Sequence, residues 1–349
     1  MPLTELISNL RNALAQTLGQ APELRLLNDK GLAHWHVRLQ GTGLLVRIPK
    51  QSQMALGAVD NLRYEAACFE RAAPSSHVPR LAHVIAPSPG LPWGALLVED
   101  IDGVSADGPA HIDAIMRALA AIHALPVAPG PARAPLLNDR DPLAGMLTEV
   151  RAQARYLDDP CIAAPTRRLL QQRLQLVQGT LAQACQGLAP RLITFDAHPG
   201  NFLITPNGKA VLVDLEKCRY SYPPLDLAHA TLYTSTSWDV SAAFALSPAQ
   251  VASAYVTWML GAGDMAAAYA PAFVPLRELM WLWSVTWCAK WLVQSTRPRS
   301  HSAGGEDWSQ DNSEAVLIAH VRARVADYLS IPTIERVQAE LHTLTGLFA

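Results

Sequence analysis

The segment from Asp196 to Asp214 gathers the side chains with the clearest capacity for chemistry. Asp196 and Asn201 flank a turn that contains Pro199-Gly200, and two strand-like runs joined by Pro206-Asn207-Gly208-Lys209 then lead to Asp214. Because a hairpin returns the chain toward its start, we expect these three oxygen-bearing side chains to converge. Carboxylate and amide oxygens suit Mg²⁺, which takes few protein ligands and completes its shell with water and phosphate. An ordinary Asn-Gly hairpin with surface acids at its ends is the alternative.

The order and spacing of these residues resembles the catalytic and metal-binding loops of the aminoglycoside phosphotransferase and choline kinase families, relatives of the protein kinases. Their pattern is H-G-D-x-x-x-x-N, a short hairpin, then D-x-D/E. The resemblance implies that Asp196 is the catalytic aspartate, which orients an acceptor hydroxyl and takes its proton. It implies that Asn201 and Asp214 hold the magnesium that bridges the phosphates of ATP, with Glu216 as an accessory ligand. Asp226 would be the structural aspartate that braces the catalytic loop.

Two departures from the family pattern stand out. Thr194-Phe195 replaces His-Gly before the catalytic aspartate, so the support that the histidine gives must come from elsewhere. Arg47 stands where protein kinases have lysine, and its guanidinium forks to phosphate but is larger than an ammonium. His198 lies in the loop, and we interpret it as a supporting residue because Asp196 already fills the role of base.

The elements that must position these residues begin with a strand-rich region. Strands are predicted over 23–27, 33–40, 44–48, 81–85 and 95–99, with an amphipathic helix at the N-terminus and a second helix over 59–73. Helical spacing follows over 142–157, 164–185, 248–261, 276–293, 314–329 and 333–344.

Glu65 lies on the apolar face of the helix predicted over 59–73. Because an unpaired buried carboxylate is costly, a cationic partner is expected, and Arg47 at the end of the strand over 44–48 is the natural candidate. The resemblance implies that this strand carries the cation that touches the ATP phosphates and pairs with a helix glutamate. A partly solvated Glu65 is the alternative.

Two further segments take nucleotide-binding roles through the resemblance. The loop over 28–33, which includes Gly31, occupies the place of the nucleotide-covering loop, although it lacks G-x-G-x-x-G and any tight turn would look similar. The run 96–100, followed by Gly103, fits a hinge whose backbone around Glu99 pairs with the edge of adenine. A plain buried strand ending in a turn is the alternative.

Two groups of aromatic side chains and one acidic run leave alternatives open. Trp283, Trp287 and Trp291 recur every fourth residue, as core packing or as the wall of a cage for a quaternary ammonium group. His34 and His36 share one side of a strand, and solvent-facing histidines are preferred to a metal site because no third ligand is evident. Four acids are expected on a solvated surface rather than in a polyamine site: Glu306, Asp307, Asp311 and Glu314.

Composition excludes several classes of protein. The 28 basic and 30 acidic side chains nearly cancel, so no global field recruits nucleic acid or an anionic membrane. The longest apolar run, 279–289, is shorter than the roughly 20 residues of a membrane span. Five separated cysteines without a C-x-x-C pair indicate reduced, buried thiols in a cytoplasmic protein.

Together these features predict a two-lobed, protein-kinase-like α+β fold. Residues 1–98 would form a nucleotide-binding lobe of sheet plus helix, 99–104 the hinge, and 105–349 a mainly helical lobe for catalysis and substrate binding. The expected function is transfer of the γ-phosphate of ATP, with Mg²⁺, to a hydroxyl of a small molecule such as an aminoglycoside, an amino alcohol or a sugar-like compound. The short interval between Asp214 and Asp226 leaves little room for the activation segment with which protein kinases hold peptides.

Two other functions stay open. Thr194-Phe195 and the missing glycine motif would suit a pseudokinase-like module that binds nucleotide and regulates a partner. A metal-dependent hydrolase is disfavoured because the dense His/Asp cluster of such sites is missing. The acceptor, the choice between ATP and GTP, and the oligomeric state are not specified by the sequence.

Overall fold

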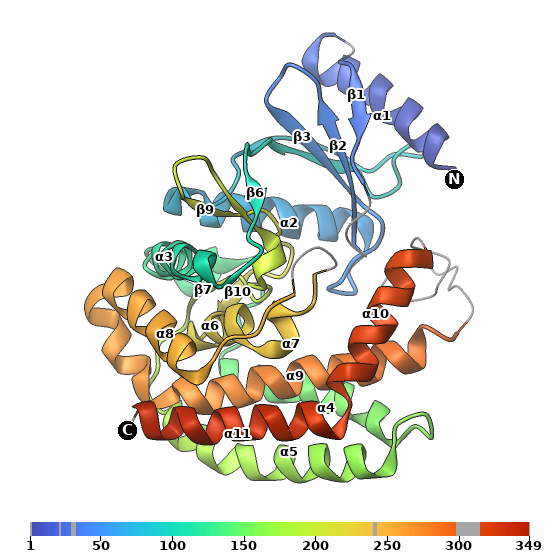
Figure 1. Cartoon of the computed structure of the whole chain (residues 1–349). Coiled ribbons are helices and arrows are strands. Elements are labelled where there is room, and N and C mark those ends of the chain that lie inside the picture. Colours follow the sequence, from blue (N-terminus) through green and yellow to red (C-terminus); the bar gives the residue numbers. More distant parts are fainter. Residues whose placement is uncertain (1, 21, 29–32, 240–242, 298–314, 349) are drawn as a thin grey trace.

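The computed structural model describes residues 2–20, 22–28, 33–239, 243–297 and 315–348. A small part rich in β-structure carries the N-terminus and stands above a larger helical part that contains the C-terminus (Figure 1). The predicted α+β class is confirmed. Within the described residues, no helix is both long and apolar enough to span a membrane.

The N-terminal part is built on a five-stranded antiparallel sheet of order β1-β2-β3-β5-β4. The strands are β1 (Leu24–Leu26), β2 (His34–Leu39), β3 (Leu44–Pro49), β4 (Leu81–Ile85) and β5 (Ala95–Glu99). All five predicted strands are present, with small differences at their ends. Consecutive side chains of a strand point to opposite faces, so each strand contributes to two packing layers.

Helices cover both faces of this sheet. On one face, Val37 and Leu97 pack in a cluster with Leu10 of α1 (Leu3–Leu18). On the other, Leu96 and its strand neighbours pack with Phe69 of α2 (Ala58–Ala72), inside the main core that continues into the helical part. The sheet is therefore buried on both sides, so polar side chains on β2 and β3 are covered and need polar partners.

Short strands connect the sheet to the helical part. β6 (Val104–Ser105) pairs with β8 (Phe202–Ile204), which forms the predicted hairpin with β9 (Ala210–Leu212). β7 (Arg191–Ile193) pairs with β10 (Arg219–Ser221). β6, β7 and β10 were not predicted because two or three residues are too few to show an alternating pattern.

The helical part is arranged around one central helix, α9, which contacts α4, α5, α6, α10 and α11. The helices are α3 (Ile112–His123), α4 (Pro142–Ala154), α5 (Ala164–Ala184), α6 (Pro224–Thr231), α7 (Tyr233–Thr236), α8 (Pro248–Ala262), α9 (Phe273–Gln294), α10 (Ala315–Tyr328) and α11 (Ile331–Phe348). Short 3₁₀ helices span Ala73–Ser75, Pro109–His111, Gly130–Arg133, Arg155–Asp158, Pro199–Asn201 and Gly263–Ala272. Because α9 is apolar around most of its circumference, it is stable only when surrounded.

Local signals mark two helix starts. Asp141 accepts hydrogen bonds from the amides of Leu143 and Ala144 at the start of α4, and Ser247 forms a capping box with Gln250 at the start of α8. The helix predicted over 142–157 ends as a 3₁₀ turn after Ala154.

The expectation that all cysteines are buried is wrong for one of them. Cys161 is exposed because it lies in the turn before α5, where no element covers it. The other four are buried, and none of the five forms a disulfide: Cys68, Cys185, Cys218 and Cys288.

Candidate active site

A cavity of about 610 Å³ lies between the sheet and the helical part. Its walls come from β1 to β3, the linker after β5, the loop that precedes β8, and helices α9 and α10. Asp196, Asn201 and Asp214 all line it, so the structure brings these three residues to one cavity.

Asp226 braces the loop that carries Asp196. Its Oδ2 accepts hydrogen bonds from the amide and the hydroxyl of Thr194, at 2.7 and 2.9 Å, and its Oδ1 accepts one from the amide of Phe195 at 2.8 Å. The Asp226 side chain is fully buried, where such hydrogen bonds are strong and their loss is costly. The bracing geometry expected of Asp226 is therefore present.

A histidine also supports this aspartate, but it comes from another part of the chain. Nε2 of His123, at the end of α3, lies 3.0 Å from Oδ2 of Asp226. Its Nδ1 accepts a hydrogen bond from the indole of Trp258 at 3.0 Å, so the proton must be on Nε2, which donates to the carboxylate. Sequence reasoning missed His123; the available signal was a polar side chain within an apolar helix face, since buried polar groups require partners.

Phe195 occupies a backbone conformation that favours glycine. Its φ of 57° lies in the left-handed region, at the position where the family pattern has glycine. The ring is buried, packs edge-on against Trp283 at 5.1 Å, and has the guanidinium of Arg219 3.5 Å from its centre. These contacts offset a backbone cost of about 1–2 kcal/mol.

Beneath the loop, Glu149 links two of those neighbours. Its carboxylate accepts hydrogen bonds from Arg219 and from the indole of Trp283, both at 2.8 Å. Burial acts to raise the pKa of Glu149, but Arg219 and the hydrogen bonds outweigh it and hold this pKa below its usual range. The loop that carries Asp196 thus rests on an ionised carboxylate, which holds the aromatic ring of Trp283 and the guanidinium of Arg219 in place.

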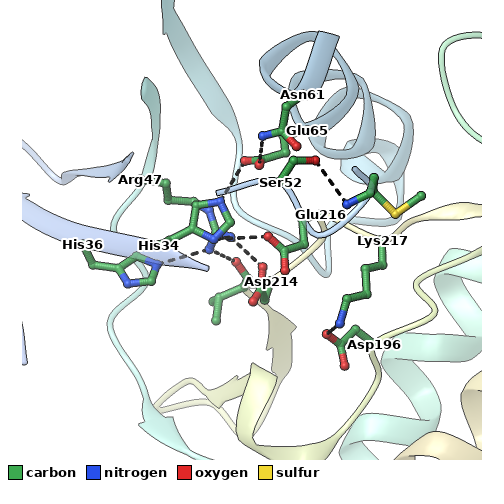
Figure 2. A network of polar contacts seen from close by, with 12 residues as sticks. His34, His36, Arg47, Ser52, Asn61, Glu65, Asp196, Asp214, Glu216 and Lys217 are labelled. Atoms are coloured by element: carbon green, nitrogen blue, oxygen red, sulfur yellow. Dashed lines mark hydrogen bonds and ion pairs between the residues drawn. The ribbon is translucent and has the colours of Figure 1, made fainter. Parts of the chain in front are cut away.

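Asp196 is held by two groups. Its backbone carbonyl accepts a hydrogen bond from the Asn201 amide at 2.9 Å, and its Oδ2 lies 2.7 Å from Nζ of Lys217 (Figure 2). Burial acts to raise the pKa of Asp196, but Lys217, and then His198 and His229, lower it below the usual value. Asp196 is therefore ionised and positioned to accept a hydrogen bond. Lys217 was absent from the sequence-based site, although it directly follows the D-x-E motif.

The expected pairing of Arg47 with Glu65 is wrong. Arg47 is buried, but its guanidinium forms an ion pair with Asp214, Nη2 to Oδ1 at 2.5 Å, and donates to the Val213 carbonyl at 2.8 Å. Glu65 instead contacts His34 at 3.0 Å and accepts a hydrogen bond from Asn61 at 2.7 Å. Glu65 is buried as predicted, and the partner changed because His34 on β2 lies between the helix and Arg47 (Figure 2).

The expectation that the two histidines of β2 face solvent is wrong for His34, whereas His36 is half-buried. His34 is only 3% exposed and contacts two carboxylates, Glu65 through Nε2 and Glu216 through Nδ1. Burial opposes protonation, but these two carboxylates outweigh it and raise the pKa of His34. His36 lines the cavity, and burial, aided by the charge of Arg47, lowers its pKa to about 3. The physical reason is that elements cover both faces of the sheet.

The acids below Arg47 fit a divalent cation. Both carboxylate oxygens of Glu216 are buried without a hydrogen bond from a described residue, although His34 lies 3.2 Å from one of them. Burial, and then the charge of Asp214, raises the pKa of Glu216 to about 8. Burial opposes ionisation of Asp214, but Arg47 beside it holds this pKa well below its ordinary value. A hard cation would neutralise the two acids and satisfy Glu216.

Asn201 completes this donor set. Its amide nitrogen is used by the Asp196 carbonyl, which leaves the side-chain oxygen available as a ligand. Ligand atoms of His34, Asp214 and Glu216 also lie within 4.8 Å of one another. Because both ring nitrogens of His34 already contact carboxylates, oxygens of Asn201, Asp214 and Glu216 are the better ligands for a metal ion.

The linker after β5 lines the cavity, as a nucleotide-binding hinge would. Glu99 and Asp100 are among its lining residues, and Glu99 also forms an exposed ion pair with Arg80 at 3.3 Å. The amide of Asp100 donates to the Gly43 carbonyl at 2.9 Å, which commits that group to the sheet. Gly31, assigned to the nucleotide-covering loop, lies outside the described residues.

The three tryptophans of α9 do not form one wall. Trp283 and Trp287 line the cavity, whereas Trp291 is buried in the core. Trp238 lies at 5.6 Å from Trp287 and 6.3 Å from Tyr328, so the aromatic surface is assembled from three segments. The four acids considered for a polyamine site lie outside the described residues: Glu306, Asp307, Asp311 and Glu314.

The fold and the braced aspartate define a phosphotransferase of the kinase-like class. A model of the phosphotransferase enzyme family matches residues 23–266, and the chain belongs to this family. It is therefore a small-molecule kinase. A comparison with curated proteins found no match.

Solved structures with the same fold include three small-molecule kinases or their complexes. A choline/ethanolamine kinase family protein from Mesorhizobium loti has 17% identity and a TM-score of 0.60, covering 97% of this chain and 99% of that one. The GDP and kanamycin complex of APH(2")-IIia has 17% identity and a TM-score of 0.60, with coverage of 92% and 99%. A microcompartment-associated aminopropanol kinase has 16% identity and a TM-score of 0.61, with coverage of 94% and 97%. At these identities the likeness establishes the fold alone.

Proposed function

We propose that this protein transfers the γ-phosphate of ATP, with Mg²⁺, to a hydroxyl group of a small molecule. The observation that carries the proposal is the placement of an ionised, braced Asp196 in the same cavity as the Arg47–Asp214 pair and the buried carboxylate of Glu216. One side of the cavity can hold a metal–nucleotide complex while the other presents a proton acceptor.

Asp196 is suited to orient the acceptor. Its Oδ2 is held by Lys217, whereas Nδ1 of His229 lies 3.7 Å from Oδ1, too far for a hydrogen bond. Burial lowers the pKa of His229 to about 4, so this ring is neutral at physiological pH. Oδ1 can therefore accept the hydrogen bond of a substrate hydroxyl and take its proton as the phosphate is transferred.

The opposite wall is suited to the nucleotide. Arg47, held by Asp214 and the Val213 carbonyl, brings a fixed positive charge to the cavity from β3. When bound, Mg²⁺ would neutralise charge on the phosphates, with Asn201, Asp214 and Glu216 as its protein ligands. The linker would supply peptide groups to the base, and because the amide of Asp100 is already used, those after it are the available donors.

The acceptor side combines aromatic surface with polar groups. Trp238, Trp287 and Tyr328 line it, together with Ser235 and His320. Such a surface fits a small, partly apolar molecule with a hydroxyl group, and an amino alcohol, an aminoglycoside or a sugar-like compound meets this description. Kanamycin and aminopropanol appear in the names of structures with this fold, which supports the same range of acceptors.

The regulatory-module alternative is less well supported. The absence of His-Gly before Asp196 favours this alternative. However, His123 and Thr194 both contact Asp226, and together they supply the support that the missing histidine would give. The test is to measure transfer of labelled γ-phosphate from Mg-ATP to a panel of amino alcohols, aminoglycosides and sugars. Turnover with at least one acceptor, abolished by Asp196→Asn, is the expected result. Nucleotide binding with no transfer to any acceptor would favour the regulatory module.

A further inference from the structure

Lys217 lies in the cavity beside Asp196, and the need to hold the loop of Asp196 in place does not explain its position. Its ammonium lies 2.7 Å from Oδ2 of Asp196 and 5.9 Å from the centre of the Trp283 ring. The two partners of the ion pair are only 12% and 13% exposed. Figure 2 shows the lysine extending from the backbone next to Glu216 toward Asp196. Asp226 already fixes the backbone of the loop that carries Asp196. The buried ammonium of Lys217 is therefore not needed to hold this loop, and another explanation is required for its position.

The chemistry of an ammonium group leaves capacity for a second partner. It carries three N–H donors, and Asp196 is the one hydrogen-bond acceptor found for them among the described residues. Burying a lysine side chain costs conformational entropy and hydration. A second anion in the cavity would use the remaining donors and offset that cost.

Distances place the transferred phosphate beside this ammonium. An acceptor hydroxyl must lie about 3 Å from the Asp196 carboxylate to give up its proton, and about 3–3.5 Å from the phosphorus that it attacks. The γ-phosphorus is then within about 6.5 Å of the same carboxylate that Lys217 contacts. The phosphate oxygens extend further toward it, within reach of a flexible lysine.

The other cations of the cavity lie on its opposite side. Among the described residues that line it, the lysines and arginines are Arg25, Arg38, Arg47 and Lys217, and the three arginines come from β1, β2 and β3. Arg38 is paired with Asp100 of the linker at 2.5 Å, and Arg47 with Asp214. Of these four, only Lys217 can approach the phosphate from the side of the acceptor.

We propose that Lys217 is a catalytic residue whose ammonium binds the γ-phosphate of the nucleotide and accompanies it to the acceptor. This inference rests on the proposed function. In the step, a bond forms between the acceptor oxygen and the γ-phosphorus, and the bond from that phosphorus to the bridging oxygen of ATP breaks. The bond electrons leave with ADP, the acceptor proton passes to Asp196, and Lys217 keeps its protons throughout. Its positive charge stabilises the negative charge on the phosphoryl oxygens in the transition state, which lowers the barrier to transfer.

The test compares two nucleotides that differ in the γ-phosphate. In calorimetric titrations, Lys217→Met should weaken binding of Mg-AMP-PNP by about tenfold, as expected for a lost charge-assisted hydrogen bond, and leave Mg-ADP affinity unchanged. Lys209→Met, at the tip of the β8–β9 hairpin and outside the cavity, is the matched control and should change neither affinity. Equal weakening of both nucleotides, or no weakening of either, would overturn the role of Lys217.

A second set of variants covers the case in which Lys217→Met folds poorly because Asp196 loses its partner. Asp196→Asn alone keeps the lysine, so it should keep the wild-type ratio of affinities for Mg-AMP-PNP and Mg-ADP, which we call the preference for the γ-phosphate. The double variant Asp196→Asn/Lys217→Met removes both charges and should lose this preference. A double variant that retains the full preference would also overturn the proposal. Failure of the wild-type protein to bind either nucleotide would refute the proposed function itself, which is a distinguishable outcome.

Discussion

Nε2 of His123 on α3 donates to Oδ2 of Asp226 on α6, across 3.0 Å in space and 103 positions in the chain. The contact is fully buried, and Trp258 fixes the tautomer that makes it possible. A helix of the core thereby supports the aspartate that holds the loop of Asp196, so loop geometry and core packing depend on each other.

Replacing His123 tests this dependence. His123→Ala removes one of the buried hydrogen-bond donors of the Asp226 carboxylate and leaves the Trp258 indole without its acceptor, so the free energy of unfolding should fall by about 2–5 kcal/mol. Urea denaturation measures the change. His111→Ala removes a histidine from a partly exposed ion pair with Asp107 and should alter stability by less than about 1 kcal/mol. A similar small change for His123→Ala would show that the contact contributes little.

Substitutions of Asp196 and Asp214 should have different effects on nucleotide binding and on turnover. Asp196→Asn should keep binding of Mg-ATP while turnover falls by about 10²–10⁴, because the proposed role of this residue is toward the acceptor. Asp214→Asn should impair both binding and turnover, since Arg47 loses its partner and the metal loses a ligand. Calorimetric titration beside a turnover assay measures both quantities. Normal turnover by Asp196→Asn would show that another group accepts the proton.

Phe195 allows a test of backbone strain. Both Phe195→Ala and Phe195→Gly lose a buried ring, which costs about 3–5 kcal/mol. Because φ is positive here, glycine should be the more stable of the two by about 1 kcal/mol, the reverse of the usual order. Thermal or urea unfolding gives the comparison.

Phe202 is the matched control for that pair of variants. It is also fully buried, but its φ of −109° is ordinary for any residue. Phe202→Ala should therefore be more stable than Phe202→Gly. The same order at both positions would mean that Phe195 is not strained.

Glu149 should make the protein sensitive to acid. Its pKa is lowered in the folded state, so its contribution to stability is present above its usual value near 4.5 and is lost as pH falls through the lower folded value. About a third of the side chain is exposed, so solvent screening limits this contribution to about 1 kcal/mol. The stability difference between wild type and Glu149→Gln should be constant from pH 7 to 5 and shrink below that. A difference that does not change with pH would show that the charge of Glu149 is unimportant.

Two tryptophans of α9 should differ in what their replacement changes, which is acceptor binding for one and stability for the other. Trp287 lines the cavity, so Trp287→Ala should raise the KM for the acceptor and leave the Kd for Mg-ATP unchanged. Trp291 is buried in the core, so Trp291→Ala should cost about 3–5 kcal/mol of stability. Steady-state kinetics and unfolding curves distinguish them. Equal effects of Trp287→Ala on both substrates would place it outside the acceptor site.

The sequence by itself determined the features that depend on neighbours along the chain. The strands and long helices follow from hydrophobic periodicity, and the turn and hairpin after Asp196 bring Asn201 and Asp214 to it within nineteen positions. The burial of Glu65 also followed from its place on an apolar helix face. These are local properties, so the order of residue types was sufficient to predict them.

The tertiary structure decided which charged and polar groups meet. Arg47 pairs with Asp214, 167 positions away, and not with Glu65, because His34 fills the space between Arg47 and the helix of Glu65. His34 became buried because helices and loops cover both faces of the sheet, which its alternating strand pattern does not reveal. His123 likewise meets Asp226, and Lys217 meets Asp196, because of how elements pack around the loop that carries Asp196. Periodicity shows which face of an element is apolar, but pairing depends on the distance and orientation between elements, and only the packed fold sets these.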